Sequence, residues 1–223
     1  MVRSVKDLEK IFSHFDKYPL ITQKRADYLL FKQAYEIIKK KEHWTLEGLK
    51  KLVGLKLSMN KGLSELLKES FPDVIPVERP KILNQLVPDP HWLAGFTAGD
   101  GCYLVNILKT NSTKSGEAVQ LVFSISQHLR DSQLLQSFID YLKCGRVKQR
   151  KGKESVEYIV TRLSDIADKI IPLFEKYLIY GEKVKDYEDF KKVAIILQKK
   201  GQLTKEGLEE IWRIKLGMNR RRK

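Results

Sequence analysis

The chain has 223 residues, 42% of them hydrophobic, which is enough for a hydrophobic core in one or two domains. Its formal net charge is +14 and its pI is about 9.6, so its surface attracts polyanions, above all nucleic acid. No apolar run approaches the roughly 18 to 20 residues that span a bilayer, and no segment combines a basic face with a broad aromatic face. Two cysteines, Cys102 and Cys144, cannot by themselves form a disulfide framework or a zinc site. We therefore expect an intracellular protein with reduced thiols that binds nucleic acid and not a membrane.

The first part of the chain has the pattern of amphipathic helices. Residues 4–14 predict a short helix, with Ser4 as a possible cap and apolar residues on one face. After a break at 19–22, two longer helices are expected at about 23–40 and 45–57, both rich in lysine on the polar side. We assign 1–63 to a mostly helical first domain.

Residues 64–91 are predicted to be a linker. They include the segment FPDVIPVERPKILNQLVPDP, which holds five of the seven prolines and lacks clear periodicity. A second domain is expected from 92 to 223.

The second domain opens with the stretch LAGFTAGDG at residues 93–101. As a helix, this stretch places Ala94 over Ala98 and Gly95 over Gly99, which allows a second helix to approach closely. The alternative is a buried helix that needs small residues only for packing within its own domain.

A glycine follows this helix and an acid ends it. We expect Gly101 to take the left-handed conformation after the helix, which places Asp100 where unpaired carbonyl groups concentrate negative charge. A divalent cation relieves that repulsion, and oxygen ligands suit magnesium or calcium. Asp100 and Gly99 are thus the candidate metal ligands, unless the acid stands there by chance.

Strand signals follow this helix. Two hairpins and further helices are expected in the order hairpin, helix, hairpin, helices: 102–110 with 118–127, turning at Lys114-Ser115-Gly116; 131–142; 145–151 with 155–162, turning at 151–153; 164–176; and 182–216, broken near Gly201. The result is an α/β protein of the α+β type, in which helices cover one face of a four-stranded antiparallel sheet.

Alternation along these strands separates two faces. The apolar face must pack on the helices and comprises Tyr103, Val105, Ile107, Leu121, Phe123, Ile125, Val147, Tyr158 and Val160. The polar face can enter a DNA major groove and comprises Asn106, Thr110, Gln120, Ser124, Arg146 or Lys148, Arg150, Glu157 and Thr161. An ordinary solvated face is the alternative, and no side chain is assigned to a base.

The chain also contains an internal repeat. A shift of 159 positions aligns residues 3–62 with 162–221 without a gap, and about a third of the aligned positions are identical. The same shift places the counterpart of residue 93 before position 1, so the first copy lacks a counterpart of the helix at 93–101 and most of the strands. We expect the chain to be a fragment, one half of a split protein or a shortened relative of a longer two-repeat protein.

The stretch LAGFTAGDG, the order of elements and the duplicated unit together resemble the LAGLIDADG homing endonucleases, most closely the monomeric, two-repeat enzymes encoded in organellar introns. The resemblance implies an αββαββα fold and a mitochondrial location. It also implies magnesium-dependent hydrolysis of both strands of a double-stranded DNA site, with calcium binding but not supporting cleavage. The acids of two signature helices hold the metals, and Asp100 matches one of them, where many relatives carry Glu. Gln127 matches a residue that orients water or metal, and Lys24 and Lys183 match basic residues of the central pocket.

The absent first signature helix leaves several possibilities open. A second chain or fragment supplies the helix and its acid, two copies of this chain pair through residues 93–100, or the chain binds DNA without cutting it. An intron RNA maturase of the same fold, which binds RNA and does not cleave, is a further alternative. Cleavage that depends on Asp100 distinguishes the nuclease from these binding proteins.

Overall fold

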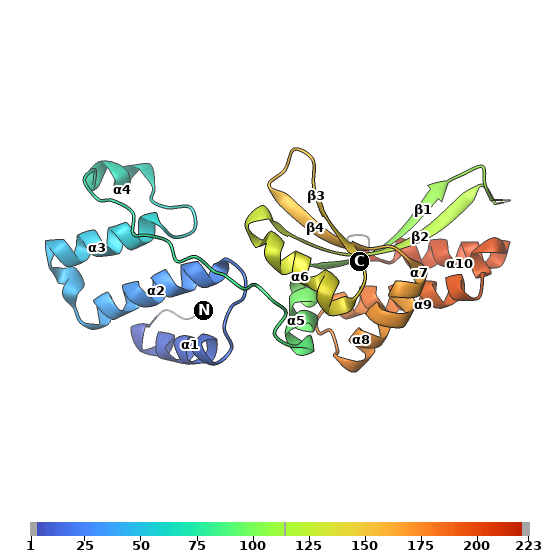
Figure 1. Ribbon diagram of the computed structural model, residues 1–223, viewed down its shortest axis with the longest axis horizontal. Coiled ribbons are helices and arrows are strands. Elements are labelled where there is room, and N and C mark those ends of the chain that lie inside the picture. Colours follow the sequence, from blue (N-terminus) through green and yellow to red (C-terminus); the bar gives the residue numbers. More distant parts are fainter. Residues whose placement is uncertain (1–3, 114, 220–223) are drawn as a thin grey trace. The chain divides into compact units, whose positions relative to one another are not determined.

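The computed structural model describes residues 4–113 and 115–219, and it divides the chain into two compact units that meet between Gln85 and Leu86 (Figure 1). The first unit is helical, and the second combines a sheet with helices. Arg3 and Lys114, which figured in the expected repeat and in the first hairpin turn, lie outside the described residues. Among the described residues, no helix is both long enough and apolar enough to cross a membrane.

The first unit consists of short amphipathic helices. Their bounds are α1 (Val5–Lys17), α2 (Lys24–Lys39), the 3-10 turn η1 (Glu42–Trp44), α3 (Leu46–Leu57) and α4 (Glu65–Ser70). The side chain of Ser4 caps α1 by accepting a hydrogen bond from the backbone N–H of Asp7 at 3.1 Å. Phe12 is buried against Phe31 and Tyr35, with ring centroids 5.6 and 4.7 Å away.

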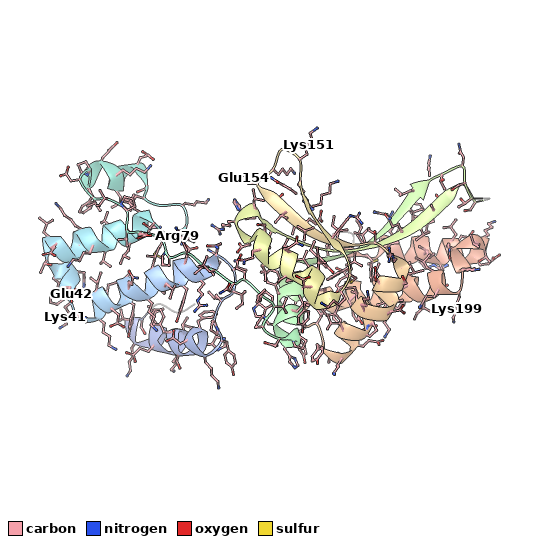
Figure 2. All side chains as sticks on the ribbon, viewed as in Figure 1. Lys41, Glu42, Arg79, Lys151, Glu154 and Lys199 are labelled. Carbon is pink, nitrogen blue, oxygen red and sulfur yellow. The ribbon has the colours of Figure 1, made fainter. Side chains whose placement is uncertain are left out.

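The segment expected to be a linker contains α4, and its following stretch is held by the first unit. Arg79, labelled in Figure 2, lies in this segment. Its guanidinium donates to Asp27 Oδ1 at 2.6 Å and to the carbonyl oxygen of Ser58 at 2.8 Å. Val77 N–H donates to the carbonyl oxygen of Gly54 at 3.3 Å. The segment lacks periodicity because discrete polar contacts with distant residues, and not one apolar face, hold it in place.

The second unit begins with α5 (Pro90–Asp100), which runs into the sheet. The other elements are β1 (Gly101–Lys109), β2 (Glu117–His128), η2 (Leu129–Asp131), α6 (Ser132–Leu142), β3 (Arg146–Gln149), β4 (Ser155–Val160), α7 (Leu163–Asp165), the π turn η3 (Ile166–Ile170), α8 (Ile171–Lys176), α9 (Lys183–Gln198), η4 (Gly201–Leu203) and α10 (Lys205–Leu216). The strands are antiparallel in the order β1-β2-β4-β3, and the helices lie on one face (Figure 1). The four-stranded antiparallel sheet predicted from the sequence is confirmed.

The apolar face of the sheet forms the core of this unit. Pairing places Tyr103, Phe123 and Val160 side by side across three strands, and at most 1% of each is exposed. The rings of Phe174 and Phe190 pack against Tyr103 with centroids 6.3 and 5.2 Å away. The predicted inward face is therefore right, although two of its members, Ile107 and Val147, are only half-buried near the sheet margins.

The helix group expected at about 164–176 is present and has an irregular middle. It consists of α7, the π turn η3 and α8 in succession. Pro172 lies in the first turn of α8, where it has no N–H to donate to the carbonyl four residues earlier and where its ring crowds that carbonyl. The wider π turn accommodates the proline.

The two units repeat the same helical scaffold down to single hydrogen bonds. Asn60 N–H donates to Asp27 Oδ1 at 3.1 Å, and Asn219 N–H donates to Asp186 Oδ1 at 2.9 Å. Each member of these pairs lies 159 positions from its counterpart. Asn60 and Asn219 also share the left-handed backbone, with φ of 48° and 56°. The repeat seen in the sequence is therefore a repeat of structure.

The pairing of Arg79 with Asp27 gives a stability prediction. Burial alone raises the pKa of the Asp27 carboxyl, but hydrogen bonds from Arg79 and from the Asn60 backbone outweigh it and hold that pKa below its ordinary value of 3.8. Replacing Arg79 with Ala leaves a buried carboxylate without its main partner, so we expect the first unit to lose about 2–3 kcal/mol of unfolding free energy. Hydrogen exchange of α2 amides measures the loss.

The matched control is Lys68→Ala, which removes an exposed ion pair with Glu65 and costs less than about 0.5 kcal/mol. Because the folded pKa of Asp27 is depressed, the stabilisation is present above the unfolded pKa and disappears as pH falls through the folded value. Equal losses in the two variants would contradict this account.

Candidate active site and nucleic-acid interface

The helix α5 is set firmly at its start and is open along part of its side. Asp89 accepts a hydrogen bond from Trp92 N–H at 3.0 Å, and Pro90 occupies the first turn. A Cβ added at Gly95 or at Gly99 would meet nothing within 4 Å. One flank of α5 is therefore bare backbone.

The small residues of α5 do not all lie on this bare flank. Ala98 is half-buried, whereas Ala94 is only 3% exposed, so of the two alanines expected to face a second helix Ala98 offers more surface. We define the open strip as Gly95, Ala98 and Gly99. The helical period predicts which small residues lie above one another, but it does not predict toward which neighbour each pair points.

Gly101 is needed for a reason other than the expected one. Its φ is −72° and its ψ is 156°, an extended conformation that any residue adopts. A Cβ at this position would lie 2.5 Å from Thr97 Cγ2 and 2.6 Å from the Thr97 carbonyl oxygen. Glycine is thus required because β1 leaves the end of α5 without a spacer residue, and not because the backbone is left-handed.

Asp100 is exposed at the end of α5 and has a partner from the sheet. Gln127 Nε2 donates to Asp100 Oδ2 at 2.7 Å. Gln127 lies near the end of β2, in phase with Ile125 and so on the same side of the sheet as the helices. This pairing joins a strand end and a helix end that are 27 positions apart, and it fixes one carboxylate oxygen of Asp100 in direction.

The two candidate lysines lie in different units. Lys183 is the first residue of α9, and its Nζ donates to the carbonyl oxygen of Gly101 at 2.5 Å, one residue from Asp100. Lys24 Nζ donates to Asn60 Oδ1 at 2.9 Å within the first unit. The structure therefore brings together Asp100, Gln127 and Lys183.

The described residues near Asp100 offer few metal ligands. Within 4–113 and 115–219, no group of three or more His, Cys, Asp or Glu side chains could hold a metal ion. Asp100 supplies an exposed carboxylate, and Gly99 lies in the last helical turn, where carbonyl oxygens have no partner within the helix. These are hard oxygen donors of the kind that magnesium and calcium prefer, so the residues fit one side of a shared site.

The cysteines do not add a nucleophile. Burial raises the pKa of the Cys102 thiol, although the nearby Lys183 ammonium opposes the shift. Burial likewise raises the pKa of the Cys144 thiol. Neither thiol is in a disulfide, and both remain protonated at neutral pH.

The uncovered face of the sheet carries most of the residues predicted to contact DNA. Pairing places Asn106 beside Gln120, and Glu157 beside Lys148. Arg150 Nη2 donates to Glu157 Oε1 at 2.9 Å, which holds the guanidinium over the sheet. Lys151 and Glu154 mark the tip of the hairpin beyond these strands (Figure 2).

Three predicted contact residues have a different setting. Ser124 is only 6% exposed, so it offers little surface to a ligand on this face. Thr110 lies past the end of β1 and pairs with Ser112 across 2.9 Å. Thr161 lies past the end of β4, where its Oγ1 accepts from Arg146 Nη1 at 3.5 Å.

Sequence reasoning missed other residues of this face. Leu104 and Leu108 are exposed on β1 on either side of Asn106, and Ser126 accepts from Arg150 at 3.3 Å. Their strand parity was visible, but only the most polar positions were taken as candidates. The face is therefore a mixed polar and apolar surface.

The fold and the site together define an α+β protein with an open sheet face and an exposed carboxylate on a helix of small residues. A family model described as LAGLIDADG endonuclease matches residues 1–35 and 93–194, which correspond to the two copies of the repeat. The chain belongs to the LAGLIDADG endonuclease family.

Two solved structures of one protein are very similar to the chain. The I-SmaMI LAGLIDADG homing endonuclease bound to cleaved DNA superposes with a TM-score of 0.98, at 49% identity over 100% of this chain and 74% of that chain. I-SmaMI bound to an uncleaved DNA target in the presence of calcium ions superposes with a TM-score of 0.96, at 49% identity over 98% of this chain and 74% of that chain. In further structures of I-SmaMI, two lysines are replaced by alanine, and these lysines are 159 positions apart, as are Lys24 and Lys183.

Curated relatives point to introns. Probable intron-encoded endonuclease 2 of Neurospora crassa is 41% identical over 215 residues, 92% of this chain and 46% of the relative. A protein in ND4 intron 1 of Podospora anserina is 69% identical over 45 residues, 20% of this chain and 10% of that protein. The chain thus spans less than half the length of these relatives.

The close approach at Gly101 can be tested directly. Gly101→Ala forces a methyl group into the Thr97 backbone, so we expect a loss of about 1–3 kcal/mol in the unfolding free energy of the second unit. Gly95→Ala is the control, because its added methyl meets open space and improves helix propensity, by up to about 1 kcal/mol. Urea unfolding followed by Trp92 and Trp212 fluorescence measures both variants, and a neutral Gly101→Ala would refute the steric explanation.

Proposed function

We propose that this chain is a site-specific double-strand DNA endonuclease of the homing type, or the larger part of one. The observation that carries the proposal is the exposed Asp100 at the end of the open strip, directed by Gln127 and placed beside Lys183. Membership of the LAGLIDADG endonuclease family and the similarity to the DNA-bound I-SmaMI structures support it.

The proposed chemistry is metal-assisted hydrolysis of a phosphodiester. A bound magnesium ion would neutralise the scissile phosphate and lower the pKa of a coordinated water molecule. Asp100 binds the cation through its carboxylate, with the Gly99 carbonyl as a second candidate ligand. Gln127 orients the Asp100 carboxylate through its hydrogen bond to Oδ2. Lys183 supplies positive charge close to the charge that develops on the phosphate. Calcium fits the same oxygen ligands and is proposed to bind without supporting cleavage.

A second acid is needed to complete this site. The open strip of α5 accepts a second helix at close range, and that helix is proposed to bring its own carboxylate. We propose a separate polypeptide or a further segment as the source, and a second copy of this chain as the competing source. The small residues of the strip allow either helix to lie within backbone contact of α5.

The first unit contains a lysine and an asparagine that could bind the backbone of such a partner. In the second unit, Lys183 and Asn219 bind the carbonyl oxygens at the start of β1, and Asn219 Nδ2 donates to Tyr103 O at 2.9 Å. Their counterparts in the first unit, Lys24 and Asn60, bind each other. We infer that Lys24 and Asn60 receive a helix–strand segment built like α5 and β1.

Burial of an equivalent aromatic pair supports this inference. Phe190 is 0% exposed beneath the sheet, whereas its counterpart Phe31 is 38% exposed. Covering Phe31 with a sheet of the same kind would remove apolar area from water, which favours association. The partner is thus proposed to bring both a signature helix and strands.

The location of the protein is inferred from its relatives. Several of them carry intron-encoded names, and one belongs to ND4 intron 1. We propose a mitochondrial intron as the origin of this chain. Structured intron RNA is the competing ligand, because the relatives are intron-encoded. A net charge of +14 attracts RNA as well as DNA.

The first test replaces Asp100 with Asn and measures cleavage of a duplex library in magnesium and in calcium. The helper is the part of I-SmaMI that this chain does not match, added or omitted. We expect cleavage in magnesium with the helper, and a loss of at least about 100-fold in Asp100→Asn because the metal loses a charged ligand. Duplex binding in calcium should change less than about threefold.

The matched control is Asp140→Asn, which changes an exposed acid on α6. This variant should cleave at the wild-type rate. Full activity of Asp100→Asn would refute the proposed site. Stronger binding to structured RNA than to duplex DNA at equal salt, without any cleavage, would favour the maturase alternative.

The second test measures binding of the same helper to variants of the first unit. Asn60→Ala removes the amide that is proposed to bind a strand carbonyl, so we expect helper binding to weaken about tenfold. Asn111→Ala, in an exposed turn of the second unit, is the control and should bind normally. Equal affinities, measured by fluorescence anisotropy, would show that Asn60 does not contact the partner.

A further inference from the structure

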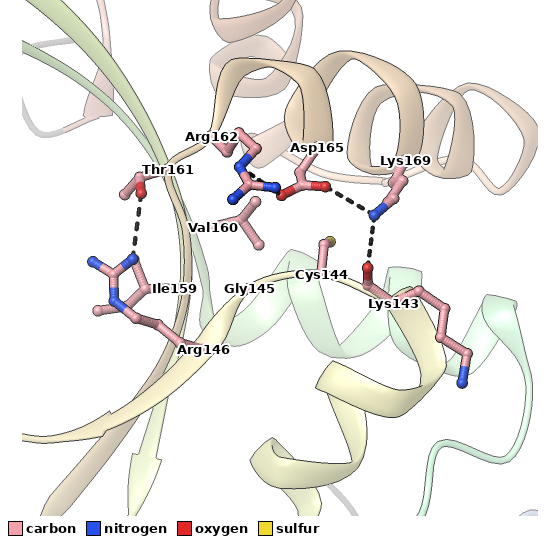
Figure 3. A pocket seen from close by; sticks show the side chains of 10 residues that line it. All are labelled: Lys143, Cys144, Gly145, Arg146, Ile159, Val160, Thr161, Arg162, Asp165 and Lys169. Atoms are coloured by element: carbon pink, nitrogen blue, oxygen red, sulfur yellow. Dashed lines mark hydrogen bonds and ion pairs between the residues drawn. The ribbon is translucent and has the colours of Figure 1, made fainter.

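A cavity of about 390 Å³ lies at the edge of the sheet in the second unit, outside the Asp100 site. It is formed by the start of β3, the end of β4 and the helical segment that follows (Figure 3). The side chains of Arg146, Thr161, Arg162, Asp165 and Lys169 contribute its polar lining. Arg146 and Thr161 belong to the face predicted to contact DNA, but Arg162, Asp165 and Lys169 are outside both that set and the proposed cleavage site.

The charges of the cavity do not balance. Asp165 is its single carboxylate among the described lining residues, and the cationic groups of Arg146, Arg162 and Lys169 line the same cavity. Asp165 Oδ1 pairs with Lys169 Nζ at 2.8 Å, and its Oδ2 lies 3.9 Å from Arg162 Nε. A net positive charge of about two therefore remains, which suits a bound anion.

The cations differ in how firmly they are held. Lys169 Nζ also donates to the Lys143 carbonyl oxygen at 2.6 Å, so this ammonium group is fixed within the cavity wall. The Lys143 ammonium group is directed away from the cavity (Figure 3). By contrast, the Arg162 side chain is 78% exposed, and Arg146 makes a long 3.5 Å contact with Thr161. The two guanidinium groups can therefore turn toward a ligand.

The position of the cavity indicates which anion it takes. Arg146 pairs with Ile159 on the uncovered side of the sheet, and Thr161 directly follows β4. Arg162 follows Thr161 and lies outside β4, so it is not one of the strand residues whose side chains point alternately toward the uncovered face. Arginine forks match phosphate oxygens, and a threonine hydroxyl is a common donor to them.

We propose that Arg146, Thr161 and Arg162 bind one phosphodiester of the DNA backbone and so set the register of the sheet on the duplex. This inference depends on the proposed function, because it assumes that the uncovered face binds DNA. It changes the expected role of Arg146 and Thr161 from reading bases to holding the backbone, and it adds Arg162. In the sequence repeat Arg162 aligns with Arg3, which lies outside the described residues.

The test is the salt dependence of duplex binding in calcium, for duplexes selected from a random library and for unselected duplexes. Loss of one phosphate contact lowers the slope of log affinity against log salt by about 0.9. Because the two arginines share one phosphate, we expect this full change in the double variant Arg146→Ala/Arg162→Ala and a smaller decrease in each single variant, with single-variant binding weakened roughly three- to tenfold and equally for both kinds of duplex. Arg213→Ala, an exposed arginine on α10, is the matched control and should leave the slope unchanged.

Further arms separate the competing explanations. Arg162→Lys keeps the charge, so it should retain the slope while losing part of the affinity, and it remains informative if Arg162→Ala folds poorly. A loss confined to selected duplexes, with the slope unchanged, would assign Arg162 to base reading and overturn the proposal. Inorganic phosphate that raises the Tm of the wild type but not of Arg162→Ala, again with unchanged slopes, would make the cavity a free-anion site. Wild-type protein that binds no duplex even with the helper present would instead refute the proposed function.

Discussion

The junction between α5 and β1 is the constraint on which the candidate site depends. The helix ends at Asp100 and the strand begins at Gly101, so the backbone turns from one to the other without a spacer. Lys183 holds the Gly101 carbonyl oxygen, and Gln127 holds the Asp100 side chain. Three elements that are distant in sequence thereby fix one carboxylate at the margin of the sheet. A flexible loop at this point would leave the direction of the acid undefined.

The duplicated helices show how the same local sequence takes on different roles. The bonds from Asn60 to Asp27 and from Asn219 to Asp186 are equivalent, so the helical corner forms with or without a sheet above it. What differs is burial, because a sheet covers Phe190 but not Phe31. The first unit therefore repeats the helical corner of the second, and the aromatic ring of Phe31 is more exposed there than its counterpart Phe190.

Charge is unevenly distributed over the surface proposed to meet DNA. In the middle of the sheet, Arg150 is paired with Glu157, which reduces net charge and orients the arginine. At the sheet edge, Arg146 and Arg162 outnumber their single acidic neighbour Asp165. We propose that this arrangement separates side chains that read bases from those that hold the phosphate backbone, a division that a high net charge alone does not reveal.

The sequence alone determined the elements and their faces. Apolar alternation with a period of two predicted which side of each strand is buried, and the 159-residue shift predicted two copies of one scaffold. Tertiary structure decided everything that depends on contacts between distant residues: the pairing of Arg79 with Asp27 across 52 positions, the burial of Ala94 and the contact of Gln127 with Asp100. It also showed that Gly101 is required by contact with Thr97 and not by its own dihedral angles. Periodicity specifies the direction of a side chain relative to its own element, but the neighbour it meets is set only when the elements pack together.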